Sequence, residues 1–280
     1  MRLMLATLLT VCLAAPAAAQ SRPLVTEDPE TVPAGFLLLE GGIDYLRGVE
    51  YPASGLGGNL FRTGTFGVSI GISTIAELQF DGGLRSRLAI RDRDVTAPLA
   101  GQVTAIGDTS STLEDLLIGA KVRFVSETDA RPAIALRFAT RVPAASDESG
   151  IGTGTFDFTI GLAAAKTVQS IRVATNFGIA MLGSPVAGHE RNQAFAYGLS
   201  VARAVAPGVE LVGEFNGRAD VGEGTPPPGT ESRAAGRFGG RITRGPIRLD
   251  AAVVVGATDR DPSLGVTAGF TWVFKGFEVK

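Results

Sequence analysis

The feature that most constrains the fold of this chain is a regular change between strand-like segments and turn-forming residues. From residue 36 onward, segments of about ten residues alternate apolar and polar side chains and are separated by residues such as Gly, Pro, Asp and Thr. Because neighbouring residues of a strand point to opposite faces, the pattern predicts strands with one apolar and one polar face. We predict twelve strands, over residues 36–46, 59–72, 75–89, 113–126, 132–142, 154–166, 169–182, 191–203, 208–218, 232–243, 246–257 and 264–274.

The prolines and the connection lengths favour one fold class for these strands, an all-β, antiparallel, up-and-down transmembrane β-barrel. No proline lies in the interior of a predicted strand, where it would remove a hydrogen bond of the sheet. Long and short connections alternate, as in bacterial barrels with short periplasmic turns and longer external loops. An even strand count then places both ends of the barrel in the periplasm. The long connections are predicted near residues 47–58, 90–112, 143–153, 183–190, 219–231 and 258–263.

The start of the chain is typical of an export signal. A charged Met1-Arg2 precedes an apolar run, and Ala17-Ala18-Ala19 offers a cleavage site before Gln20. The alternative is an N-terminal membrane anchor, although the run is shorter than a spanning helix. Cys12 lies within this leader, so the mature chain has no thiol. We therefore predict four parts: a signal peptide over 1–19, a periplasmic N-terminal segment over 20–35, the barrel over 36–274 and a periplasmic C-terminal tail over 275–280.

The apolar and polar faces predict which side chains meet lipid and which line the lumen. In the strand over 132–142, Ile134 and Phe138 share one face, and Arg137 and Arg141 share the other. A charge at the bilayer midplane costs about 2–4 kcal/mol for Arg or Lys, so the apolar face must point to lipid. Parity assigns to the lumen a set rich in arginine that includes Arg85, Arg87, Lys121, Arg123, Arg137, Arg141, Arg172, Glu210, Glu214, Arg233, Arg237 and Arg241.

This charged lumen has two interpretations. Arg233, Arg237 and Arg241 recur every fourth residue and form a row on one strand face. Guanidinium groups bind carboxylates in a bidentate manner, so the row could belong to a salt-bridge network that fills the barrel. The other interpretation is a cation-lined passage that favours small anions.

The last predicted strand carries a pattern that resembles the terminal signal by which outer-membrane barrels are recognised for insertion. The pattern consists of Thr267, Gly269, Trp272 and Phe274 at the expected spacing. It predicts the outer-membrane assembly machinery and outer-membrane lipid as partners. Residues 275–280 extend beyond the aromatic residue that usually closes such chains, and the alternative is an ordinary lipid-facing strand with an aromatic belt.

Enzyme, metal and nucleic-acid functions find little support. His189 is the only histidine, and the barrel phospholipases of the outer membrane have Ser two residues after their catalytic His, where this chain has Arg191. Zinc needs several His or Cys ligands, which the mature chain lacks. The glycines at 150, 152 and 154 precede a strand rather than the helix that a phosphate loop needs. We therefore predict no catalytic, cofactor or metal residues. The net charge of −2 also predicts no nucleic-acid partner.

Short motifs resemble a family of outer-membrane proteins named for the meta-pathway of phenol degradation. The opening is RPLVTEDPETVPAG over Arg22 to Gly35, in which Glu27 replaces an aspartate of the family pattern. LEDLLIGAKVRF from Leu113 and PAIALRFATRVP from Pro132 match a strand and its hairpin partner. The resemblance implies a channel or transporter for aromatic or other organic compounds and brings no catalytic residues.

Together, these features predict a passive outer-membrane channel for small organic solutes. An arginine-rich lumen suits carboxylate-bearing aromatic compounds better than phenol itself. The alternative is a closed structural barrel with a salt-bridged interior and no transport, and a third is a soluble periplasmic lipid-binding barrel. The sequence does not fix the oligomeric state.

Overall fold

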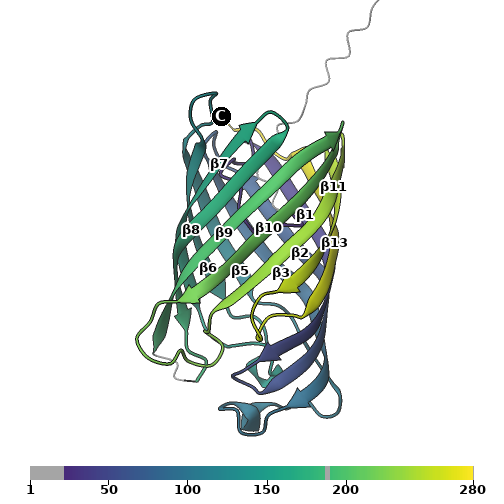
Figure 1. Ribbon diagram of the computed structural model, residues 1–280, viewed down its shortest axis with the longest axis vertical. Helices are drawn as coiled ribbons and strands as arrows, with labels where there is room; N and C mark the ends of the chain where they lie inside the picture. Colours follow the sequence, from purple (N-terminus) through teal and green to yellow (C-terminus); the bar gives the residue numbers. More distant parts are fainter. Residues whose placement is uncertain (1–21, 187–189, 280) are drawn as a thin grey trace, which may run out of the picture.

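The computed structural model describes residues 22–186 and 190–279 and is almost entirely β-sheet (Figure 1). The predicted signal peptide and His189 lie outside these described residues. A short strand, β4 (Thr109–Thr112), pairs with residues 86–89 of β3. The two short 3-10 helices are η1 (Ala100–Gln102) and η2 (Asp147–Ser149). The long strands are β1 (Phe36–Tyr51), β2 (Leu56–Gly71), β3 (Ala76–Arg93), β5 (Leu116–Val125), β6 (Ala133–Val142), β7 (Asp157–Val168), β8 (Ile171–Gly183), β9 (Arg191–Ala206), β10 (Val209–Asp220), β11 (Arg233–Arg244), β12 (Ile247–Gly256) and β13 (Leu264–Lys275).

The first and last strands close the sheet into a barrel. β1 pairs with β13 in antiparallel register from Phe36 opposite Lys275 to Arg47 opposite Leu264. The other long strands pair with their neighbours in chain order. Closure leaves no open sheet edge in the wall, as a hydrocarbon environment requires. The predicted antiparallel barrel of twelve strands is confirmed.

The wall has an apolar outer face and a polar inner face. On β12, Ile247, Leu249 and Val253 are about half exposed, whereas Arg248 and Asp250 are buried. Because only the outer face meets lipid, this alternation suits a bilayer around the barrel and a charged lumen. No helix among the described residues is long and apolar enough to cross a membrane.

The two ends of the barrel differ in their connections (Figure 1). At the end where the C-terminus lies, which we call the turn end, residues 169–170 join β7 to β8 and residues 245–246 join β11 to β12. At the opposite end, the loop end, residues 94–115 link β3 to β5 and residues 221–232 link β10 to β11. We call the corresponding parts of the lumen the turn half and the loop half.

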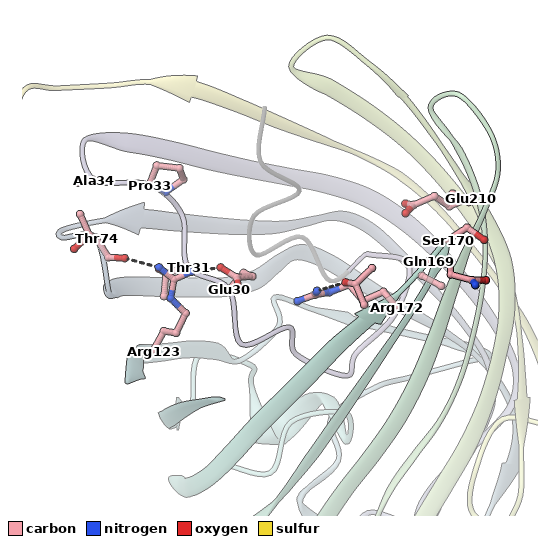
Figure 2. Close-up of a pocket in the computed structure, with 13 residues that line it drawn as sticks. Glu30, Thr31, Pro33, Ala34, Thr74, Arg123, Gln169, Ser170, Arg172 and Glu210 are labelled. Atoms are coloured by element: carbon pink, nitrogen blue, oxygen red, sulfur yellow. Dashed lines mark hydrogen bonds and ion pairs between the residues drawn. The ribbon is translucent and has the colours of Figure 1, made fainter. Parts of the chain in front are cut away.

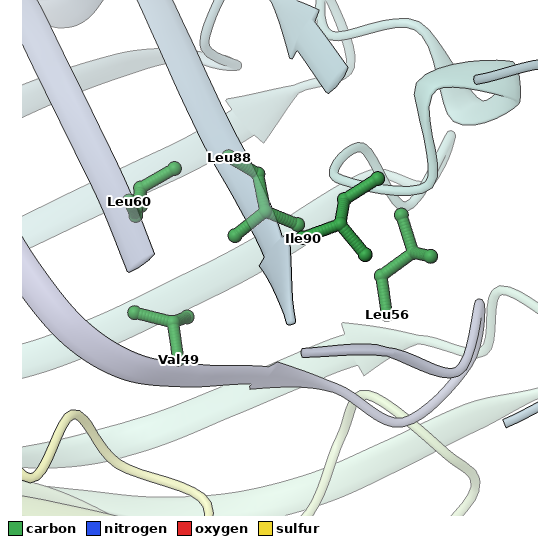
Figure 3. Packing of buried hydrophobic residues seen from close by; sticks show 5 residues of the cluster. All are labelled: Val49, Leu56, Leu60, Leu88 and Ile90. Atoms are coloured by element: carbon green, nitrogen blue, oxygen red, sulfur yellow. The ribbon is translucent and has the colours of Figure 1, made fainter. Parts of the chain in front are cut away.

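The predicted long connection over residues 47–58 is wrong, because most of it belongs to strands. β1 runs to Tyr51 and β2 begins at Leu56, so a short turn joins them. The inward side chains of these extensions form an apolar cluster with β3 at the loop end, which gives the strands a reason to continue (Figure 3). The cluster consists of Val49, Leu56, Leu60, Leu88 and Ile90.

A bulge in β2 changes which residues face the lumen. Gly42 lies opposite Thr65 and Ile43 opposite Thr63, so Gly64 is an extra residue, with a φ of 64° that suits glycine. The parity of β3 changes beside the bulge, where Ser86 and Leu88 are buried. Arg85 and Arg87 are therefore exposed on the other face, and their predicted place in the lumen is wrong.

The N-terminal segment lies inside the barrel, which corrects its predicted place in the periplasm. Leu24 packs on Ala202 and Val212 of the inner wall, and Val32 packs on Leu38 near the turn end. The segment pairs with no strand, so its backbone N–H groups need other acceptors. Carboxylates of the lumen supply several of them. We call residues 22–34 the plug segment.

Candidate functional site

The plug segment lies between two cavities of the lumen. A cavity of about 620 Å³ at the turn end is lined by Glu30, Thr31 and Pro33 of the segment together with wall residues (Figure 2). A cavity of about 600 Å³ toward the loop end is lined by the segment from its other side, at Arg22 and Glu27. The segment thus separates these two cavities of the lumen.

Glu27 is the central anionic contact of the plug segment. Its carboxylate lies 3.3 Å from Lys121 Nζ and 3.4 Å from Arg137 Nε. Its backbone N–H donates to Asn176 Oδ1 at 2.6 Å, and Asn176 Nδ2 donates to its carbonyl at 2.9 Å. Burial by itself would raise the pKa of Glu27, but the charges of Arg137 and Lys121 lower that pKa below its usual 4.5. Glu27 is therefore charged at neutral pH.

Lys121 joins the wall to the plug segment through a fully buried ammonium. Its three donors find Glu27, the carbonyl of Asp28 at 2.8 Å and Glu77 at 3.0 Å. Glu77 is also fully buried and accepts the backbone N–H of Val32 at 2.5 Å. A buried charge pair needs such additional hydrogen bonds to offset its desolvation.

Two further acids bind wall cations near the turn end, and Figure 2 shows one of the two pairs, Glu30 with Arg123. Asp28 accepts two hydrogen bonds from Arg172, of which Nη2 donates at 2.7 Å, and Arg172 also contacts Glu127 at 2.8 Å. Glu30 forms an ion pair with Arg123, whose Nη2 donates to the carbonyl of Thr74 at 3.0 Å. Burial opposes ionisation of Asp28, but the hydrogen bonds and charge of Arg172 lower its pKa.

The start of the plug segment is held by two acids of the wall. Glu214 accepts the backbone N–H groups of Val25 at 2.9 Å and Thr26 at 2.8 Å, and it pairs with Arg237 at 2.7 Å. Arg22 lies 3.6 Å from Asp250 and donates to Thr267 Oγ1 at 3.1 Å.

Two facing glycines make the room for Arg22. Gly42 and Gly269 lie opposite each other on β1 and β13. A Cβ at either position would come within 2.5 Å of the Arg22 guanidinium. The close approach of this side chain to the wall therefore requires both glycines.

In the loop half, charges pair within the barrel and its loops. Arg62 binds Glu114 through two hydrogen bonds and lies 3.3 Å from Asp44. Arg141 lies 3.2 Å from Asp115 and also pairs with Asp157. None of these partners belongs to the plug segment.

The predicted lumen residues fall into separate groups. Lys121, Arg123, Arg137 and Arg172 contact the plug segment directly. Glu214 accepts hydrogen bonds from the segment and pairs with Arg237 of β11. Arg241 pairs with Glu210 at 3.4 Å, and Arg141 lies in the loop half. Arg233 donates to the carbonyls of Arg260 and Glu50 near the loop end. The predicted arginine row of β11 is thus divided among three surroundings.

The residues of the predicted insertion signal lie on both faces of β13. The rings of Trp272 and Phe274 have centroids 4.4 Å apart, and Trp272 is 41% exposed on the outer face. Thr267 and Gly269 face inward, where they contact Arg22. Two of the four positions therefore also hold the plug segment.

Three acids of the plug segment belong to the site, although the parity of the strands does not predict them. Glu27, Asp28 and Glu30 follow Leu24 and precede Val32, so three acids stand between two apolar residues. The predicted lumen has more cations than acids. An acidic cluster between apolar residues is therefore the sequence signal that could have predicted their pairing with this wall. Among residues 22–186 and 190–279, no group of three or more His, Cys, Asp or Glu side chains could hold a metal ion.

Comparison with known proteins places these features in a family and a fold. A sequence model of the family described as "Putative MetA-pathway of phenol degradation" matches residues 20–275. By sequence, no match to a curated protein was found.

Three solved structures are similar in fold. An outer membrane channel from Pseudomonas putida F1 has a TM-score of 0.61 and 12% identity, and the match covers 88% of this chain and 98% of that one. The translocator domain of the autotransporter NalP from Neisseria meningitidis has a TM-score of 0.52 and 12% identity, with 86% and 89% covered. The NanC porin has a TM-score of 0.50 and 8% identity, with 87% and 100% covered. At these identities, the likeness shows the outer-membrane barrel fold.

Proposed function

Because this chain belongs to the family described as "Putative MetA-pathway of phenol degradation", we propose that it is an outer-membrane channel for the passive uptake of small organic solutes, among them aromatic or anionic compounds. The observation that carries the proposal is the plug segment between two lumen cavities of about 620 and 600 Å³. In this function, the plug segment closes the resting channel and solutes pass when it moves.

The contacts of the plug segment suit a movable part. It is held by ion pairs, by hydrogen bonds to side chains such as Glu214 and Asn176, and by small apolar contacts at its two ends, rather than by a strand ladder. A barrel of this size has an interior between the side-chain-filled eight-stranded barrels and the open porins. Moving the segment would join the two cavities without breaking a strand pair.

The channel function includes an export route and excludes catalysis. The signal peptide over 1–19 would direct the chain to the periplasm, and cleavage would leave the segment tethered to the barrel at Gly35. Thr267, Gly269, Trp272 and Phe274 would be recognised by the assembly machinery during insertion. The barrel carries no reaction in this proposal, and binding and passage are its whole activity.

The ion pairs also favour a second candidate, a closed structural barrel without transport. Lys121, Arg172 and Arg237 each have a carboxylate partner within hydrogen-bond distance. A lumen filled by such pairs would stiffen the barrel and block it. The two functions differ in whether the plug segment can leave.

A disulfide between the plug segment and the wall tests this difference. A Cβ built on Gly198 of β9 lies 3.5 Å from Cβ of Thr26, within the spacing of about 3.5–4.5 Å that disulfides need. The mature chain has no other cysteine, so a Thr26→Cys/Gly198→Cys double variant forms one defined bond. Thr26→Cys alone is the matched control.

The measurement is single-channel conductance in a planar bilayer before and after reduction. For a channel, the oxidised double variant is silent and the reduced form shows discrete steps, while the single variant shows steps under both conditions. Silence of all forms, from protein shown to be folded by its heat-modifiable gel mobility, would instead establish the closed barrel. Equal steps in oxidised and reduced protein would show that the segment does not close the passage.

A further inference from the structure

The wall cations around the plug segment depend unequally on its carboxylates. Among the described residues, Glu30 is the one carboxylate within salt-bridge distance of Arg123, and Glu27 is the one for Arg137. Arg172 pairs with both Asp28 and Glu127, and Lys121 pairs with both Glu27 and Glu77. Each of these two cations therefore has one carboxylate partner outside the plug segment. Withdrawal of the segment would leave Arg123 and Arg137 without an anionic partner.

We infer that these four cations form a binding site for small organic polycarboxylates, and that the plug segment occupies this site as an internal ligand. The inference rests on the proposed channel function and names its substrate class. A solute with two or three carboxylates would compete with Glu27, Asp28 and Glu30 for Lys121, Arg123, Arg137 and Arg172. Binding of the solute would thereby free the segment and open the lumen.

The geometry of the segment resembles that of a ligand in its site. Its three acids together contact three strands: Glu27 contacts β5 and β6, Asp28 contacts β8 and Glu30 contacts β5. Asp28 is bound by two nitrogens of one guanidinium, which is the usual mode of carboxylate recognition by arginine. The contacts are therefore those that a separate polycarboxylate would make.

The charge balance supports an anionic ligand over a neutral one. With one arginine and three acidic residues, the plug segment carries a net charge of −2, which its withdrawal removes from the lumen. Leaving partly buried guanidinium groups unpaired is unfavourable, and a neutral phenol could not compensate for it. A polycarboxylate restores the lost pairs, so its binding and the exit of the segment are coupled.

The test measures exposure of the plug segment without any need for conduction. Thr26 is buried and its hydroxyl has no hydrogen-bond partner, so Thr26→Cys is a mild change that reports on release of the segment. The rate of labelling by an uncharged maleimide is followed in the full mature chain while citrate is added. The labelling rate should rise severalfold and saturate. Sodium chloride at the same ionic strength and a neutral sugar should leave it unchanged.

A second cysteine controls for general loosening of the barrel. Ser110 is buried at the loop end, where its hydroxyl donates to the carbonyl of Ser149, away from the plug segment. Labelling of a Ser110→Cys variant should not respond to citrate. A parallel rise at both positions would mean that citrate loosens the whole fold, and it would overturn the inference.

Competition gives a sharper test through the citrate concentration at half effect. Glu27→Gln weakens the internal ligand and should lower that concentration by roughly tenfold, because the competing docked state is less populated. Arg137→Gln removes a contact of both competing anions, Glu27 and the solute, so it should change the half-effect concentration less than Glu27→Gln does. Arg141→Gln, which changes an arginine in the loop half, should leave it unchanged.

The inference is overturned if citrate does not change the labelling rate, if chloride or the sugar acts equally, or if Glu27→Gln leaves the half-effect concentration where it was. A failure of the channel function itself would appear elsewhere, as silence of the reduced disulfide variant in the bilayer. The two failures can therefore be told apart. Heat-modifiable gel mobility shows for each variant that the barrel has folded.

Discussion

In the turn half of the lumen, four wall cations take carboxylates from the plug segment, whereas in the loop half Arg62 and Arg141 take them from the barrel and its own loops. Lys121 and Arg137 share Glu27 of the segment, while Arg62 binds Glu114, which lies two residues before β5 in the chain. These four pairs of the turn half can therefore be broken by movement of one segment. The loop half keeps its pairs whatever the segment does.

This difference locates the movable and permanent parts of the lumen. The loop half also contains the apolar cluster around Leu60 and Leu88 (Figure 3). A charged solute cannot compete for these apolar contacts. Apolar packing is insensitive to pH and salt compared with ion pairs. Changes in the turn half should thus alter both stability and gating, and changes in the loop half should alter stability alone.

The largest effect is expected from Lys121→Met in the turn half. The change leaves Glu77, whose side chain is fully buried, without its cation, and it also removes a contact to Glu27. Breaking a buried pair by removing one partner costs about 3–5 kcal/mol. The free energy of unfolding of the refolded barrel in urea measures this loss.

Lys166→Met is the matched control for that variant. Lys166 lies at the turn end, is partly exposed and pairs with Glu127 at 3.7 Å, so the change should cost less than about 1 kcal/mol. Equal losses for the two lysines would show that the Lys121 pair contributes no more than a surface pair. The proposal that buried ion pairs of the turn half hold the plug segment would then fail.

An intermediate effect is expected from acid. The folded pKa values of Glu27 and Asp28 lie below the usual 4.5 and 3.8, so docking gains stability that is fully present above these usual values. The gain is lost as the pH falls through the lowered values, because protonation then favours the undocked segment. Open-channel probability should therefore stay low at neutral pH and rise only below about pH 4.

The variant Glu27→Gln sharpens the acid prediction. Its side chain cannot ionise, so part of the opening should already be present at neutral pH and the remaining acid response should be smaller. Recordings from neutral pH down to about 3 compare the two proteins. A closed channel with an unchanged acid response in the variant would contradict a docking role for the Glu27 carboxylate.

The same comparison explains what the sequence could predict. The barrel follows from local rules, since the two-residue period of β8 and β12 and the placement of the prolines mark strands one by one. The bulge at Gly64 could not be found in this way, because one extra residue changes parity without altering composition. For that reason, Arg85 and Arg87 were placed on the wrong face.

The plug segment was hidden for a different reason. Its contacts join residues far apart in the chain, such as Glu27 with Asn176 and Val25 with Glu214. A single irregular segment has no period by which to recognise its partners. Parity nevertheless predicts Lys121, Arg123, Arg137 and Arg172 as lumen residues, and all four contact the plug segment. Their excess over the predicted lumen acids indicates an anionic partner, and the plug segment supplies it.

The smallest effect is expected from Glu114→Gln in the loop half. Arg62 loses a bidentate carboxylate but keeps Asp44 at 3.3 Å, and the new amide oxygen can still accept a hydrogen bond from it. A partly exposed pair of this kind is worth about 1 kcal/mol, so the unfolding free energy in urea should fall by about that amount. Conductance and its response to acid should stay those of the parent protein, because no contact of the plug segment changes. A change in gating from this variant would mean that the two halves are coupled, and the plug segment would then be one part of a single network through the whole lumen.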